Sequence, residues 1–419
     1  MNDLTRRNAI VLPSQAELVE LSASLDGSHG ANRANPFAGV KLIQADNDIS
    51  AIEEWLSATA KNPHTHRSYK REAYRLVLWS IYFRQKPISS LMVGDLRDFE
   101  DWLANPVRHE DWLPEWRVFN GPLAERSRLQ AMTILQGMFN WLVAAQYLAG
   151  NPFVLMNFKQ VKENIRSMNK KAPTKFFEKD LWRWLTSFLD TLPSVKWPTD
   201  ETGKFLSFED GKDSAGVAQY WRPEKWSEKR FERIRFIVLF LYGSCVRRSE
   251  LANGYMGQIY KAGEVWAWDV LGKGGKDEPV VLDDETMVAM RRYRLHRGLS
   301  PAPQYGESKI PIVVKLDREE PMTDWMLYHE IKSFLKHAEM YLRHIEPGHE
   351  EWLGKLAHGS AHWMRHTWAS HAAAAGVPIR ATADQLRHSS TATTEKVYVH
   401  STLEQRQKEM ANIRQGENS

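Results

Sequence analysis

The chain has 419 residues, 42% hydrophobic and 26% charged, so it is long enough to bury the cores of two or three domains. A net charge of +4 is weak support for a polyanionic partner, and no apolar run approaches the ~20 residues of a transmembrane helix. The lone cysteine, Cys245, excludes an internal disulfide and indicates a reducing cytosol. Because free cysteines are usually buried, we interpret it as a small core residue of a helix.

The N-terminal part is predicted to be helical after an aperiodic extension. Residues 1–47 include a stretch rich in Gly, Asn and Pro, and we expect an arm or a loosely attached extension. Apolar residues then recur at helical spacing. The predicted helices begin at an N-cap, Asp48, and continue at residues 65–83, 95–103 and 123–146. Residues 48–157 are therefore expected to form a compact all-helical domain.

A basic segment follows this domain and is predicted to be a linker at residues 158–175. From Lys159 to Lys175 there are six basic residues and one acidic residue, a net charge of +5. Such a segment could follow a phosphate backbone, with Lys170 and Lys171 as candidate DNA contacts. A linker exposed only to solvent explains the charges equally well.

Residues 176–400 are predicted to combine helices with a small β-structure. Two extended segments, residues 265–270 and 278–282, indicate a β-hairpin with Lys273 at its turn. Residues 192–222 are polar and are expected to be a long loop. Helices are expected at residues 178–189, 227–242, 285–297, 322–342, 361–375 and 379–386. The expected fold class is mainly α with a small β-hairpin or sheet (α+β).

Short motifs in this second region supply two arginines, a lysine, histidines and a tyrosine. They are Arg247 in Arg-Arg-Ser-Glu-Leu, Lys273 in Gly-Lys-Gly-Gly-Lys, His362, Arg365 and His366 in His-Trp-Met-Arg-His-Thr, and finally His388 and Tyr398. Two guanidinium groups can hold a phosphate, a phenol can attack it, and proton donors can serve the leaving oxygen. This set is sufficient to break a phosphodiester through a covalent tyrosine intermediate without a metal.

Each residue taken alone has a simpler interpretation. Arg247 could form a surface ion pair with Glu250, and Tyr398 could be a core aromatic. His362 and His366 could ligate zinc, but no Glu follows His362 and cysteine pairs are absent. The Gly-Lys-Gly-Gly-Lys string lacks the order of a nucleotide-binding loop. The joint order of the motifs is far more specific than any one of them.

In this order the motifs resemble those of tyrosine recombinases of the phage integrase family. The family's Arg-x-Ser-Glu-Leu, hairpin lysine, His-x-x-Arg-His-Thr and Thr-Thr…Tyr…His patterns are all present. Residues 65–69 and 138–153 resemble the family's core-binding domain, so the resemblance covers residues 48–400. Two departures occur: Arg387 replaces the usual glycine before His388, and the ten positions from His388 to Tyr398 are one more than usual.

The resemblance implies a site-specific DNA recombinase or integrase that cleaves and rejoins strands through a 3′-phosphotyrosine. Tyr398 is then the nucleophile, and Arg247 and Arg365 hold the scissile phosphate. Lys273 is the expected general acid for the leaving 5′-oxygen. The phosphotyrosine conserves the energy of the broken bond, so neither ATP nor any other cofactor is expected.

The remaining polar residues of the motifs have supporting roles by the same resemblance. His362 is the expected acid/base partner for the tyrosine proton, and His388 is expected to donate a hydrogen bond to the phosphate. Glu250 would orient the groups of the first motif, and His366 is a further supporting residue.

Double-stranded DNA is the expected partner, and no membrane partner is expected. Candidate phosphate contacts outside the linker are His66, Arg67, Lys70, Arg71, Arg126 and Arg128. A solvated helix face is an equal alternative for any one of them. The resemblance also implies a tetramer on paired DNA sites, an exchange helix within the tail at residues 401–419, and room for accessory recombination proteins. The expected location is the cytoplasm, on the nucleoid.

Two other functions use parts of the same pattern. A nicking and closing enzyme similar to type IB topoisomerases would share the chemistry without strand exchange. An architectural DNA-binding protein would keep the fold with a relic site. The separate N-terminal domain argues against the first function, and the complete set of reacting groups argues against the second.

Overall fold

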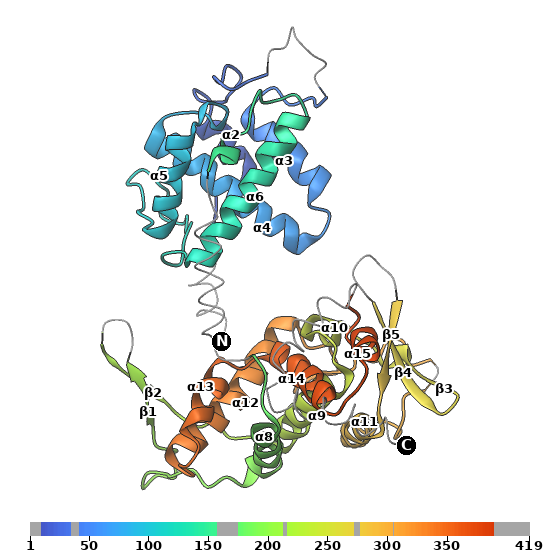
Figure 1. Cartoon of the computed structure of the whole chain (residues 1–419). Coiled ribbons are helices and arrows are strands. Elements are labelled where there is room, and N and C mark those ends of the chain that lie inside the picture. Colours follow the sequence, from blue (N-terminus) through green and yellow to red (C-terminus); the bar gives the residue numbers. More distant parts are fainter. Residues whose placement is uncertain are drawn as a thin grey trace, which may run out of the picture. The chain divides into compact units, whose positions relative to one another are not determined.

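The computed structural model divides the chain into two compact units, Met1–Ala172 and Pro173–Ser419 (Figure 1). The residues that it describes are 10–34, 42–156, 175–212, 216–271, 277–304 and 306–388. The predictions for Lys273, Tyr398, the linker up to residue 174 and the tail at residues 401–419 therefore lie outside the described residues. In the described ranges, no helix is both long enough and apolar enough to span a membrane.

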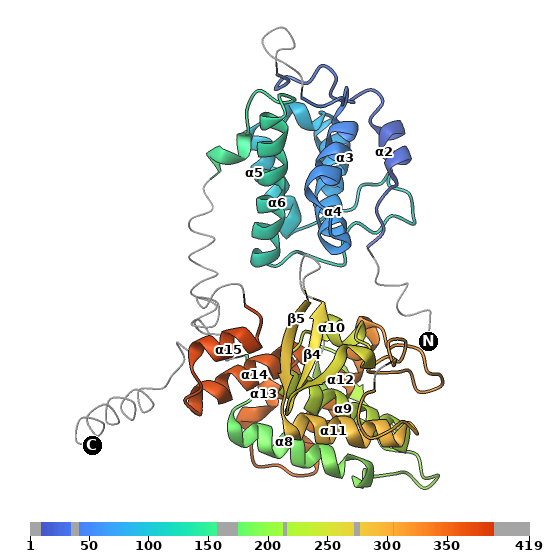
Figure 2. The ribbon, with the colours of Figure 1, turned by 90° about the vertical axis from the view of Figure 1, so that its right-hand side faces the viewer.

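The first unit consists of helices around one apolar core. Its elements are α2 (Gln15–Leu21), α3 (Asp48–Thr59), α4 (Pro63–Trp79), the π-helical turn η1 (Ser80–Arg84), η2 (Ile88–Ser90), α5 (Val93–Ala104), α6 (Glu125–Ala144) and η3 (Pro152–Leu155). Helix α6 contacts α3, α4 and α5, and it buries Met132, Leu135 and Phe139 in this core (Figure 2). The spacing of these residues places them on one helix face, which is why periodicity predicted the helix.

The N-terminal segment differs from the expected loose extension. Helix α2 begins with a capping box in which Ser14 and Glu17 bond each other's backbone N–H, and Leu18 of this helix is fully buried. Further along, the backbone of Asn32 hydrogen bonds to Ser89 and Ala149. Residues 10–34 are thus part of the folded unit. The contacts that hold this segment are individual bonds to residues far away in the sequence, so the segment shows no periodic pattern of apolar residues.

The start of α3 also differs by one residue from the prediction. Asn47 is the N-cap, and Asp48 is the first helical residue. The buried carboxylate of Asp48 accepts hydrogen bonds from the Ser89 backbone N–H (3.0 Å) and the Tyr147 hydroxyl (2.8 Å). Burial raises the pKa of Asp48 to about 6, against the opposing effect of these bonds. Asp48 therefore links three segments of the unit as well as starting a helix.

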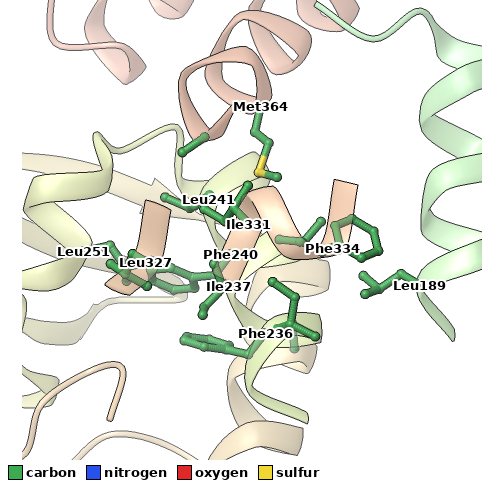
Figure 3. Close-up of a cluster of buried hydrophobic side chains, with 14 of the residues drawn as sticks. Leu189, Phe236, Ile237, Phe240, Leu241, Leu251, Leu327, Ile331, Phe334 and Met364 are labelled. Atoms are coloured by element: carbon green, nitrogen blue, oxygen red, sulfur yellow. The ribbon is translucent and has the colours of Figure 1, made fainter. Parts of the chain in front are cut away.

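The second unit packs its helices around α9. They are α8 (Lys179–Thr191), α9 (Glu228–Ser244), α10 (Arg248–Ala252), α11 (Asp284–His296), α12 (Asp324–His344), α13 (Glu350–His358), α14 (Ala361–Ala374) and α15 (Ile379–Gln385). Phe240 and Leu241 of α9 lie in one buried cluster with Ile331 of α12 and Met364 of α14 (Figure 3). Because Met364 is fully buried, it fixes α14 against α9.

An antiparallel sheet of order β3-β4-β5 lies beside α15 (Figure 1). Its strands are β3 (Ile259–Ala262), β4 (Val265–Leu271) and β5 (Asp277–Leu282). Strands β4 and β5 are the predicted hairpin, and β3 was not predicted. The Val281 backbone bonds the Gln385 side chain through both its N–H (3.0 Å) and its C=O (2.8 Å). The sheet is therefore tied to the helix that precedes His388.

The prediction of a long loop at residues 192–222 is wrong in part. The segment contains a second antiparallel pair, β1 (Phe208–Lys212) and β2 (Ala218–Trp221). Trp197, Phe208 and Trp221 form an aromatic cluster that contacts His337 of α12. Three separate aromatic side chains thus anchor a polar segment. The predicted fold class is confirmed: the chain is mainly helical with small antiparallel sheets.

Candidate active site

The candidate site is assembled from three separate parts of the second unit. Helix α9 ends at Cys245, whose left-handed backbone (φ 56°) turns the chain toward α10. Arg247 then caps α10: its backbone N–H donates to Glu250 Oε2 (2.6 Å) and its Nη1 to Oε1 (2.9 Å). This reciprocal contact orients the Arg247 side chain, which remains 46% exposed. The other parts are helix α14 and the turn after α15.

Arg365, on α14, connects the other two parts of the site. Its Nη1 donates to the backbone oxygen of Cys245 (2.6 Å), and its Nη2 donates to the backbone oxygen of Leu386. Burial, together with the nearby charge of Arg247, lowers the pKa of Arg365 to about 10. A guanidinium has five N–H donors, so three remain after these two bonds. Arg365 can thus support the backbone and still bind an anion.

Three histidines lie around this arginine. His362 and His366 share one face of α14 with ring centroids 4.4 Å apart, and His388 follows α15. Burial and the nearby positive charge of Arg365 lower the pKa of all three, to about 4 for His366 and His388. For His366, the neighbouring His362 is the larger of the charge effects. All three are therefore neutral at pH 7, and each imidazole can accept one proton.

Sequence reasoning missed the proximity of Lys175 to these histidines. It treated Lys175 only as part of the basic linker, yet the lysine charge also lowers the pKa of His362 and His366. Close by in the sequence, the Phe177 backbone N–H donates to Thr367 Oγ1 (2.9 Å). His371 forms two hydrogen bonds. Its Nε2 bonds the Phe177 carbonyl oxygen (3.1 Å), and its Nδ1 bonds the Tyr242 hydroxyl (2.9 Å). Helix α14 therefore fixes the segment that carries Lys175.

Sequence reasoning also noted Arg387 only as a departure from a pattern. In the structure, Arg387 Nη2 donates to Glu250 Oε2 (2.5 Å), so one carboxylate pairs with both Arg247 and Arg387. A turn residue that contacts a motif 137 positions away gives no local sequence signal.

The candidate DNA contacts on the first unit divide into two groups. His66, Arg67, Lys70 and Arg71 of α4 line one groove of about 960 Å³, together with Lys61, Ile10 and residues 12–14. Arg126 is exposed on α6, whereas Arg128 Nη1 donates to the Leu123 backbone oxygen (3.0 Å). Neither α6 arginine lines the groove. Lys170 and Lys171 lie outside the described residues.

Among the described residues, no group of three or more His, Cys, Asp or Glu side chains is placed to hold a metal ion. The two α14 histidines, which suggested zinc as an alternative, therefore lack a third ligand in that part of the chain. Cys245 is fully buried, and burial raises the pKa of its thiol well above the usual value. Its thiol is thus a poor nucleophile, and its contribution to the site is the carbonyl bonded by Arg365.

Residues 224–405 match the model of the phage integrase family. These residues form a phage integrase domain. The match includes every motif from Arg247 to Tyr398, so the predicted family is confirmed. Members of this family are enzymes that break and rejoin DNA.

Curated relatives of the phage integrase domain include tyrosine recombinases. The chain is 27% identical over 173 residues to tyrosine recombinase XerD of Rickettsia conorii, which covers 40% of the chain and 52% of the relative. It is 28% identical over 327 residues to tyrosine recombinase XerC of Myxococcus xanthus. That alignment covers 75% of this chain and 86% of the relative. The alignment with the Rickettsia relative thus spans only about half of that protein.

Solved structures show the same fold at low sequence identity. The Tn1549 transposon integrase in complex with transposon right end DNA has a TM-score of 0.53 at 16% identity and covers 87% of this chain and 98% of its own. The site-specific recombinase XerH bound to difH substrate has a TM-score of 0.52 at 14% identity and covers 95% and 94%. Both span the two units of this chain.

The bonds of Arg365 lead to a prediction about stability. Lysine keeps the charge but lacks the two separate Nη atoms with which the guanidinium reaches the Cys245 and Leu386 carbonyl oxygens, so Arg365→Lys should lower the unfolding free energy by about 1.5–3 kcal/mol. The matched control is Arg183→Lys on α8, whose side chain is 79% exposed and should matter by less than about 0.5 kcal/mol. Denaturant unfolding at pH 7 measures both. Equal effects would show that Arg365 does not join the segments.

Proposed function

We propose that the protein is a site-specific DNA recombinase that breaks and rejoins strands through a 3′-phosphotyrosyl intermediate. The observation that carries this proposal is the bond from Arg365 to the backbone of Cys245, two residues before Arg247, which brings two guanidinium groups into one site where Arg247 lowers the pKa of Arg365. Such a pair favours an anion, and a phosphate between the guanidinium groups would neutralise both charges. The phage integrase domain around the pair makes a DNA phosphodiester the anion of choice.

The proposed cleavage step forms one bond and breaks another. The Tyr398 oxygen attacks phosphorus, and the bond from phosphorus to the 5′-oxygen breaks. The phenol has an ordinary pKa of ~10, so its proton must leave as the bond forms. His362 is the proposed acceptor, because its lowered pKa keeps it neutral at pH 7. Lys273, in the connection between β4 and β5, is the proposed donor to the leaving 5′-oxygen.

The other residues support the transition state in this proposal. Arg247 and Arg365 stabilise the charge that develops on the non-bridging oxygens. His388 donates a hydrogen bond to one of these oxygens, and a bound phosphate would raise its pKa from about 4. Glu250 orients Arg247, and His366 packs against His362. Rejoining reverses the step, with a 5′-hydroxyl as the attacking group.

Double-stranded DNA is the proposed substrate. The Tn1549 transposon integrase and XerH, which were solved in complex with DNA, share the fold over most of this chain. We assign the α4 groove, lined by His66, Arg67, Lys70 and Arg71, to the DNA phosphates, and Arg126, Arg128, Lys170 and Lys171 to further contacts. Four subunits on two paired sites, at the nucleoid, complete the proposal.

A DNA substrate with a nick beside the cleavage site tests the function. The short fragment diffuses away after cleavage, so the phosphotyrosine accumulates as a covalent adduct on a denaturing gel. Wild-type protein should form the adduct, and Tyr398→Phe should bind the same DNA without forming it, because the substitution removes only the attacking oxygen. An adduct with Tyr398→Phe would disprove the nucleophile, and no adduct with wild type would disprove the function. Transfer of the strand to a second duplex distinguishes recombination from simple nicking and closing.

A matched control separates the nucleophile from the general acid. A sulfur atom in place of the 5′-bridging oxygen leaves without a proton, so Lys273→Ala should form the adduct on that substrate at nearly the wild-type rate. On normal DNA the same variant should be slower by about 10²–10⁴-fold, the usual contribution of general acid catalysis. Equal slowing on both substrates would remove Lys273 from this role.

The α4 groove leads to a prediction about salt dependence. Each phosphate contact releases counterions, so Arg67→Gln with Lys70→Gln should reduce the slope of log K against log salt concentration by about 2. Affinity should fall by the same factor for specific and unrelated DNA. Arg183→Gln, on the surface of α8 and outside the groove, is the control. An unchanged slope in the double variant would place the groove away from DNA.

A further inference from the structure

The turn between α15 and the end of the described chain has an unusual backbone. Arg387 has φ 50°, in the left-handed region that side chains with a Cβ rarely adopt. Its backbone N–H bonds the Asp384 carbonyl oxygen (2.9 Å), and the next N–H, of His388, bonds Ala383 (3.0 Å). A glycine would fit this position with less strain. The arginine is therefore held here at a cost in backbone strain that glycine would avoid.

The side chain of Arg387 is directed into the protein and not toward solvent. It is only 2% exposed, and its Nη2 contacts Glu250 Oε2 at 2.5 Å. The same carboxylate accepts hydrogen bonds from the backbone N–H and from Nη1 of Arg247. Glu250 is thus held between one buried arginine and one half-exposed arginine. Any change in Glu250 is transmitted to Arg247.

The remaining nitrogens of Arg387 show how it can act. Its Nε and Nη1 are buried and have no hydrogen-bond partner among the described residues. Because these atoms are covered by protein, they are not open to a DNA phosphate. Arg387 can reach the reaction only through Glu250, or through the turn that it shares with His388. Arg365 holds the same turn from the other side by donating to the Leu386 carbonyl.

We propose that Arg387 is a positioning residue that holds the Glu250 carboxylate in place and thereby fixes Arg247 at the scissile phosphate. The inference rests on the proposed function. It assigns a role in the phosphate site to a buried arginine that does not touch the phosphate.

The charges around Glu250 support this role. Burial alone would raise the pKa of Glu250, but the hydrogen bonds from Arg247 and Arg387 together keep it below the usual value. The third charged group that faces it is Arg365 of α14. Without Arg387, the buried carboxylate keeps fewer of these bonds, so it should take up a proton at a higher pH. A protonated Glu250 would bind Arg247 less well.

The test uses four full-length proteins: wild type, Arg387→Gly, Glu250→Gln and the double variant. Glycine suits the left-handed turn, so Arg387→Gly should fold. Its rate of adduct formation on the nicked substrate should fall by up to about 100-fold, the effect of misplacing a reacting group, while single-site DNA affinity stays unchanged. A fifth protein, Arg387→Lys, should recover part of the rate. The acid limb of the pH–rate profile should move to higher pH in Arg387→Gly, and no such shift should occur when Glu250 is already glutamine.

Comparison of the four rates decides between mechanisms. If Arg387 acts through Glu250, the double variant should be no slower than Glu250→Gln alone. The proposal would be overturned if the losses of the two single variants multiplied in the double variant. It would also be overturned if Arg387→Gly kept the wild-type rate, with or without weakened DNA binding.

Unfolding experiments separate this inference from the proposed function. The same four proteins give a double-mutant cycle of unfolding free energies without any DNA. Coupling between Arg387 and Glu250, combined with no adduct from the wild type, would reject the recombinase function while leaving the contact in place. Absence of coupling would reject the inference whether or not the wild type cleaves DNA.

Discussion

The arrangement of the site depends on the guanidinium of Arg365, which bonds two backbone carbonyls that belong to separate segments. Cys245 is the C-cap of α9, and Leu386 is the C-cap of α15. Helix α14 carries the arginine between them, so a single side chain joins the Arg247 loop to the His388 turn. Carbonyl oxygens offset part of the cost of burying this charge, but burial and Arg247 still lower its pKa to about 10. The positive charge of Arg365 is therefore still destabilised, and a bound anion would stabilise it.

The core makes this arrangement possible because it fixes the helices that carry these groups. Met364, adjacent to Arg365, is fully buried against α9. Near the end of α9, a Cβ on Gly243 would lie 1.8 Å from Thr286 Oγ1, so only glycine permits the close approach of α9 and α11. The apolar packing therefore sets the position of α14, and the polar contacts of Arg365 and Glu250 set the geometry at its surface. Rigid support of this kind allows polar groups to be held in place before a substrate binds.

The sequence predicted the helices with a clear apolar face, such as α4 and α6, and the β4–β5 hairpin. It did not predict α10, α13, β3 or the β1–β2 pair, because these elements are short and are held by distant side chains such as Trp197. The order of the motifs indicated which groups belong to one site, and the structure places Arg247, Arg365 and the histidines together. The role of Arg387 could not be predicted, because it depends on the left-handed turn and on a tertiary contact with Glu250. The proximity of Lys175 to the histidines depends on tertiary structure in the same way.

Arg247 and Arg365 are proposed to bind the scissile phosphodiester and to neutralise its negative charge. Adduct formation by Arg247→Ala on a nicked substrate tests this role most directly, with either a normal phosphate or a neutral methylphosphonate at the scissile position. Arg247 is half-exposed and bonds no backbone carbonyl in the described structure, so its removal should mainly remove charge. We predict little or no adduct on the phosphate and a clear adduct on the methylphosphonate, which has no negative charge to compensate. Equal impairment of Arg247→Ala on both substrates would contradict the account.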